Sequence, residues 1–147
     1  MKKALSPALF ELFRQMLPFE QAHALRVFDR LIEQGDTHPD LLTAALLHDV
    51  GKARYPLKPW ERASAVLAKK FFPGRVVGWG QGEPHGLKAG LVVAEQHARW
   101  GAEMAEAAGG SDLAVRLIAC HQDQAPTQLS EAENVLLSVL QSVDEIS

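Results

Sequence analysis

Helix start and stop signals recur along this 147-residue chain at intervals that suit helices, and they leave little room for β-strands. The predicted helices cover about residues 7–17, 19–34, 37–48, 60–72, 89–108 and 111–120, and a last one runs from Ser130 almost to the C-terminus. The best strand candidate, Arg75–Trp79, is interrupted by Gly78. The pattern therefore predicts an all-α fold with about six to seven helices.

Capping residues support several of these boundaries. Ser130 and Glu133 have the spacing of a capping box, and Gly35 suits the left-handed backbone that often ends a helix. Thr37 with Asp40 resembles a capping box in which Asp replaces the usual Glu, so we expect the third helix to begin there. The glycine-rich segment 73–88 predicts a long loop that could act as a lid.

The composition is that of one soluble globular domain, which we expect to span residues 1–147. Hydrophobic residues make up 47% and charged residues 22%, and the net charge of −3 is spread without long blocks of one sign. We therefore expect no duplex nucleic acid and no membrane as partners, while the oligomeric state stays open. The single cysteine, Cys120, cannot form an intrachain disulfide, which fits a reducing compartment and a cytoplasmic location.

Polar side chains occupy the apolar faces of five of the predicted helical segments. His97 follows Val93 by four residues, and Asp144 follows Leu140 by four, so each continues an inward stripe. The complete set is His23, His48, Asp49, His97, His121 and Asp144. We expect all six side chains to point into the core.

Inward carboxylates need a cation, because an unpaired buried charge is costly. Arg26, Lys52 and Arg99 are near enough in sequence to serve Asp49 or Asp144. Neutral imidazoles in the same core cannot neutralise a carboxylate, whereas a divalent metal binds neutral histidine and ionised aspartate together. Each residue alone could be an ordinary hydrogen-bonded core group, but six on separate segments favour a metal site.

The segment Ala45–Lys52 reads Ala-Leu-Leu-His-Asp-Val-Gly-Lys and resembles the central motif of the HD-domain metal-dependent phosphohydrolase superfamily. Other matches follow in the family's order: His23, His97 with Gly101-Ala102-Glu103 after it, His121 and Asp144. The resemblance implies an HD-domain-like helical bundle. It also implies that one metal is held by His23, His48, Asp49 and Asp144, and that in members with both additional histidines Asp49 bridges to a second metal held by His97 and His121.

The resemblance also implies a phosphohydrolase in which a metal-bound hydroxide attacks a phosphate ester or anhydride of a nucleotide or a similar small phosphorylated molecule. We expect Asp49 and Lys52 to be catalytic, and Lys52 and Arg54 to bind the substrate. The expected cofactor is one or two divalent ions among Fe, Mn, Co, Ni, Zn and Mg. Histidine-rich ligation favours a transition metal.

Two other functions fit the same residues. A regulatory HD module could keep the ligands and bind a nucleotide without turning it over. A purely structural helical domain could instead pair its inward polar groups with one another, and it would bind no metal.

Overall fold

The computed structural model describes residues 4–124 and 126–147, and every regular element in that part of the chain is helical. Seven α-helices have nine residues or more, which confirms the all-α prediction. None of the helices in the described ranges is long and apolar enough to cross a membrane. The elements are α1 (Pro7–Gln15), α2 (Pro18–Glu33), α3 (Pro39–Leu47), the 3-10 helix η1 (Val50–Arg54), α4 (Pro59–Phe71), α5 (Val76–Trp79), the 3-10 helix η2 (Gly86–Lys88), α6 (Ala89–Ala107), α7 (Asp112–Cys120) and α8 (Glu131–Glu145).

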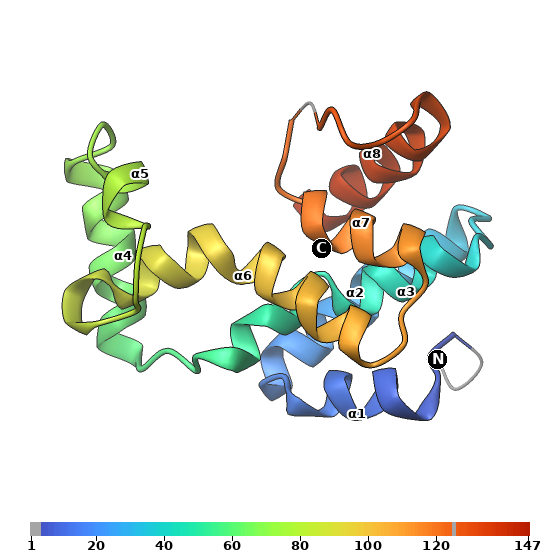
Figure 1. The fold of residues 1–147 in the computed structure, drawn as a ribbon, viewed down its shortest axis with the longest axis horizontal. Coiled ribbons are helices and arrows are strands. Elements are labelled where there is room, and N and C mark those ends of the chain that lie inside the picture. Colours follow the sequence, from blue (N-terminus) through green and yellow to red (C-terminus); the bar gives the residue numbers. More distant parts are fainter. Residues whose placement is uncertain (1–3, 125) are drawn as a thin grey trace.

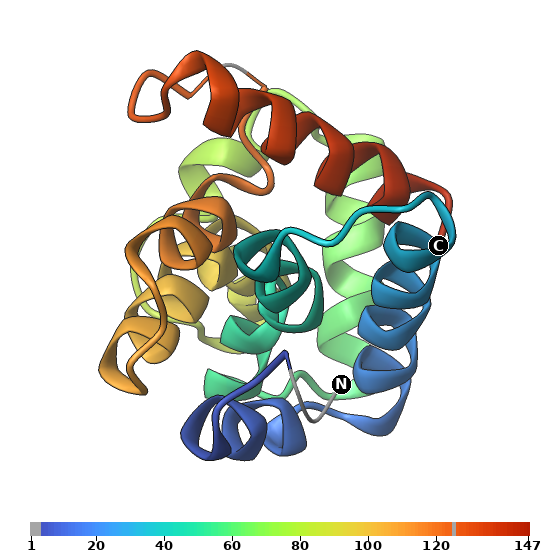
Figure 2. The same ribbon diagram turned by 90° about the vertical axis from the view of Figure 1, so that its right-hand side faces the viewer.

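Helix α3 is the centre of the fold. Every residue from Leu41 to Leu47 is buried, so this helix needs neighbours on all sides. It contacts α1, α2, α7 and α8, and Figure 2 shows these four helices arranged around it. Because α3 ends directly before His48 and Asp49, the central helix delivers two of the predicted site residues to the middle of the molecule.

Most predicted helix boundaries agree with the structure. Ser111 and Ser130 cap α7 and α8, each accepting a backbone N–H with its hydroxyl oxygen. Gly35 has the expected left-handed conformation, with φ of 90°. At the start of α3, the prediction that Thr37 caps the helix is wrong.

The N-cap of α3 is His38. Its Nδ1 accepts a hydrogen bond from the backbone N–H of Asp40 at 3.3 Å. Pro39 occupies the first helical position, where its lack of an N–H costs nothing, and this places the cap one residue later than the sequence suggested.

The glycine-rich segment 73–88 is not a continuous loop, since it contains α5 and η2. Together with α4 it projects from the N-terminal end of α6 (Figure 1). Gln96 of α6 ties it down by donating from Nε2 to the carbonyl oxygens of Gly80 and Gly82, at 3.2 and 3.0 Å. The glycines therefore interrupt the helices of this segment without removing them.

Helix α6 and η1 approach each other closely at Gly51. A Cβ atom built there would lie 1.9 Å from the carbonyl oxygen of His97 and 2.6 Å from the backbone nitrogen of Gly101. Only glycine permits this contact, which brings the end of α3 alongside His97.

Replacing Gly51 with alanine is expected to destabilise the protein by at least about 1–3 kcal/mol, because the added methyl group must push η1 away from α6. Denaturant unfolding measures the effect. Gly78→Ala is the matched control, since nothing lies within 4 Å of the added atom, and it should change stability by less than about 0.5 kcal/mol. Equal effects of the two substitutions would contradict this account of the contact.

Candidate metal centre

The six polar side chains predicted to point inward lie together in the structure, in two groups of three. The potential ligand atoms within each group all lie within 4.8 Å of one another. We call His23, His48 and Asp144 the first triad, and Asp49, His97 and His121 the second triad.

The first triad joins α2, the end of α3 and α8. His23 Nε2 lies 2.7 Å from Asp144 Oδ1, and His48 Nε2 lies 3.3 Å from the same oxygen. The side chain of His48 is buried, whereas those of His23 and Asp144 are 24% and 31% exposed. This triad is therefore open to solvent on one side.

The second triad is buried throughout. His97 Nε2 lies 3.2 Å from Asp49 Oδ1 and also 3.2 Å from His121 Nε2. The other Asp49 oxygen, Oδ2, is 3.7 Å from His48 Nε2 of the first triad. The Asp49 carboxylate thus lies between the two triads, where the bridging role implied by the family resemblance requires it.

Backbone carbonyl groups fix the orientation of three of the four imidazoles. Since a carbonyl oxygen can only accept a hydrogen bond, the ring nitrogen facing it must carry the proton. These contacts join His48 Nδ1 to Ala45 O (2.9 Å), His97 Nδ1 to Val93 O (3.0 Å) and His121 Nδ1 to Ile118 O (2.8 Å). In the neutral rings, Nε2 then presents a lone pair to the centre, as a metal ligand must.

This tautomer leaves three nitrogen atoms without a proper partner. The Nε2 lone pairs of His97 and His121 face each other at 3.2 Å with no proton between them. His48 Nε2 is buried and has no hydrogen-bond partner in the described part of the chain. Unsatisfied buried acceptors are rare, and a cation would satisfy all three. The nitrogen and oxygen atoms of the two triads therefore fit divalent metal ions, and each triad could hold one.

The pKa values of the site follow from burial and from the neighbouring charges. Burial and the nearby charge of His48 lower the pKa of His121 to about 4. Burial also opposes protonation of His48, but the carboxylates of Asp144 and Asp49 outweigh it and raise the His48 pKa. His121 is consequently neutral and ready to ligate at neutral pH, whereas protons compete with a metal for His48 at a higher pH than for His121.

Burial tends to raise the pKa of Asp49, but the contact with His97 and the charges of His48 and Lys52 hold this pKa far below its usual range. Lys52 Nζ lies 2.6 Å from Asp49 Oδ2, which makes Lys52 the cation paired with the central carboxylate. Of the cations considered from the sequence, Lys52 is the one that meets this carboxylate. Arg26 bonds the backbone of Ser147, and Arg99 pairs with Glu103.

Arg54, which the sequence predicted to bind the substrate, lies away from the cavity over the triads. Its guanidinium bonds Glu103 Oε2 at 3.0 Å and lies over the ring of Trp100, with Cζ 5.4 Å from the ring centroid. It is not among the described residues that line the cavity over the triads. The structure therefore does not bring Arg54 together with the other predicted site residues.

A cavity of about 550 Å³ opens over the triads. Its lining adds three glutamines and Glu145 to the predicted residues: His23, Asp49, Lys52, His121, Gln122, Gln124, Gln141, Asp144 and Glu145. Gln141 also holds α8 to the end of α7, since its Nε2 donates to the carbonyl oxygens of His121 and Asp123 at 3.0 and 2.8 Å. The sequence reasoning missed the glutamines, although Gln141 lies one helical turn before Asp144 on α8.

Comparison with known proteins agrees with this geometry. A family model described as HD domain matches residues 21–146, a range that contains both triads. No curated protein and no solved structure matches the chain. Because the family model covers most of the sequence, the chain belongs to the HD domain family.

Proposed function

We propose that this protein is a metal-dependent phosphohydrolase that cleaves a phosphate ester or anhydride of a nucleotide or a similar small phosphorylated molecule. HD domains are typical of metal-dependent hydrolases, and they bind divalent metals. The observation that carries the proposal is the pair of triads, in which carbonyl-oriented imidazoles direct unprotonated Nε2 atoms at two carboxylates.

In this proposal the first triad together with Asp49 would hold one ion, and the second triad, which includes Asp49, would hold another. Four imidazoles favour transition metals such as Mn, Fe, Co, Ni or Zn over Mg. When bound, such ions polarise a phosphoryl oxygen and lower the pKa of a coordinated water.

Lys52 is the residue we assign to the phosphoryl group. Its ammonium lies 2.6 Å from Asp49 Oδ2, and the Lys52 side chain lines the cavity and is one-third exposed, so it can contact a bound anion. A fixed cation at this point would stabilise the negative charge on the phosphoryl oxygens in the transition state. Lys52 is preferred to Arg54 because Arg54 is already paired with Glu103 away from the cavity.

The cavity supports a small substrate. Its volume of about 550 Å³ lies in the range of small-molecule sites, and its mouth adjoins the partly exposed His23 and Asp144. Glutamine side chains in the lining offer neutral hydrogen-bond donors and acceptors, which suit sugar hydroxyls or the edge of a base.

Asp49→Asn is expected to reduce hydrolysis by about 100-fold or more, because it removes the charge shared by both triads while keeping the shape of the side chain. The assay measures product release from a panel of phosphate esters and nucleotides in the presence of Mn²⁺, Fe²⁺ or Co²⁺. Asp112→Asn, at an exposed position in the first turn of α7, is the control and should keep full activity. A wild-type protein that binds nucleotides without forming product would instead indicate the regulatory module.

Lys52→Gln is expected to lower kcat/KM by about 100-fold while metal binding persists, since the substitution removes a cation and no metal ligand. Lys52→Arg should recover part of the loss. Activity and metal content are measured on the same samples, with exposed Lys70→Gln as the control. Loss of bound metal in Lys52→Gln would show that the lysine supports the ligands and not the substrate.

Metal affinity is expected to weaken as pH falls, by up to about tenfold per pH unit below the raised pKa of His48, because a protonated imidazole has no lone pair to donate. The His121 proton should compete only near pH 4, where that group begins to titrate. Titration of the metal-free protein with Co²⁺ between pH 5 and 8, followed by visible absorption, gives the slope. An affinity that does not vary with pH would contradict ligation by His48.

A further inference from the structure

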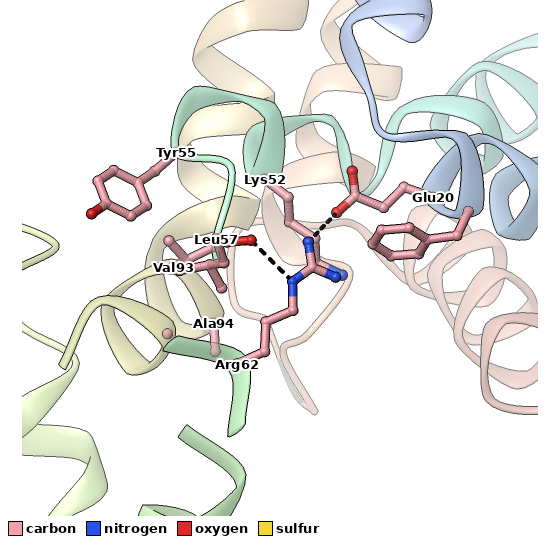
Figure 3. Close-up of a pocket in the computed structure, with 9 residues that line it drawn as sticks. Glu20, Lys52, Tyr55, Leu57, Arg62, Val93 and Ala94 are labelled. Atoms are coloured by element: carbon pink, nitrogen blue, oxygen red, sulfur yellow. Dashed lines mark hydrogen bonds and ion pairs between the residues drawn. The ribbon is translucent and has the colours of Figure 1, made fainter. Parts of the chain in front are cut away.

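A second, smaller pocket adjoins the metal centre. It has a volume of about 150 Å³, and Lys52 lines both this pocket and the cavity over the triads. Figure 3 shows its walls, which come from the start of α2, the connector before α4, α4 itself and α6. We call it the Arg62 pocket; its other lining residues are Phe19, Glu20, Tyr55, Leu57, Gly90, Val93 and Ala94.

The guanidinium of Arg62 is held in this pocket with unused hydrogen-bonding capacity. Its Nε donates to the carbonyl oxygen of Leu57 at 3.4 Å, and its Cζ lies 4.6 Å from the centroid of the Phe19 ring. The nearest carboxylate oxygen, Glu20 Oε1, is 3.9 Å away, which is an ion pair but too long for a hydrogen bond. A guanidinium has five N–H groups, so most of them remain able to bind a ligand anion.

Glu20 lies beside Arg62 and is itself committed elsewhere. Its carboxylate is buried, and Oε2 accepts the backbone N–H of Leu17 at 3.0 Å to cap α2. Only Oε1 faces Arg62, as Figure 3 shows. The pocket therefore contains two cationic side chains, Lys52 and Arg62, and one carboxylate that is partly satisfied by the backbone.

The size of the pocket restricts what it can hold. A volume of 150 Å³ corresponds to about five water molecules at about 30 Å³ each, which suits one phosphoryl group and is too small for a nucleoside. Leu57, Val93 and Ala94 add apolar side chains to the lining, so an anion entering the pocket would bind at the cationic groups of Lys52 and Arg62.

We propose that the Arg62 pocket binds a second phosphoryl group of the substrate, next to the one that reacts at the metal centre. The preferred substrates would then carry two phosphoryl groups, with Lys52 lying between their binding positions. This inference rests on the proposed phosphohydrolase function and adds the substrate class to it. A guanidinium is well suited to the role because it can bind phosphate oxygens through two parallel hydrogen bonds.

The test compares inorganic pyrophosphate with inorganic phosphate as ligands of the Mn²⁺-loaded protein, by calorimetry at one fixed concentration of free Mn²⁺. Arg62→Gln is expected to weaken pyrophosphate binding by about tenfold or more and phosphate binding by less than about twofold. Arg99→Gln, which changes an exposed arginine bonded to Glu103 and Gln96, is the control and should alter neither affinity. Chelation of Mn²⁺ by pyrophosphate is the same for every variant, so it cancels in the comparison.

Two more variants separate ligand binding from a structural role of the ion pair. Glu20→Gln removes the ion pair but leaves Arg62 in place, so pyrophosphate should bind this variant at least as tightly as the wild type. Arg62→Lys keeps the charge and should lose less affinity than Arg62→Gln. The proposal is overturned if Glu20→Gln weakens pyrophosphate binding as much as Arg62→Gln does, or if Arg62→Gln affects both anions equally or neither.

Hydrolysis is measured separately, which keeps the two proposals distinguishable. A protein that binds pyrophosphate through Arg62 but hydrolyses no phosphate compound would overturn the phosphohydrolase function and retain the anion pocket. An active hydrolase whose pyrophosphate affinity does not depend on Arg62 would overturn the pocket alone.

Discussion

The metal centre depends on hydrogen bonds from imidazole Nδ1–H groups to backbone carbonyl oxygens. His48 and His121 follow directly on the last residues of α3 and α7, and each bonds the carbonyl three residues earlier. The last carbonyls of a helix have no partner within the helix, so these rings use acceptors that the helix ends leave free. The points at which α3 and α7 end therefore decide which nitrogen of each ring faces the centre.

The segment that follows α3 contributes both to the packing of the fold and to the candidate metal site. His48 and Asp49 contribute one ligand to each triad, Gly51 allows η1 to lie against α6 beside His97, and Lys52 returns to pair with Asp49. Burial of an ionised aspartate is costly unless it is paired. Lys52 supplies that pairing, while the close approach at Gly51 places Asp49 within reach of His97, so the same short segment serves the fold and the site.

The helical period explains why the six triad residues could be predicted from sequence and Arg62 could not. Spacing of three or four residues from Val93 or Leu140 gives direction within one helix, which sufficed for His97 and Asp144. Arg62 meets Glu20 because α4 approaches α2 in the folded protein. The spacing of residues along one helix cannot predict such a tertiary contact. Local signals also misled where two rules competed: Pro39 moved the cap from Thr37 to His38, and helical turns formed in the glycine-rich segment despite its composition.

The charge balance of the candidate centre supports the proposal of an anionic substrate. Four of the six triad side chains are imidazoles, and only Asp49 and Asp144 carry negative charge. Two carboxylates would not neutralise two divalent ions if both triads held one, and Lys52 adds a further positive charge beside them. In a largely buried site this excess would be weakly screened, so an anion would be needed to balance it. A phosphoryl group meets that need better than a neutral substrate, and a second phosphoryl group beside Arg62 would balance the charge further.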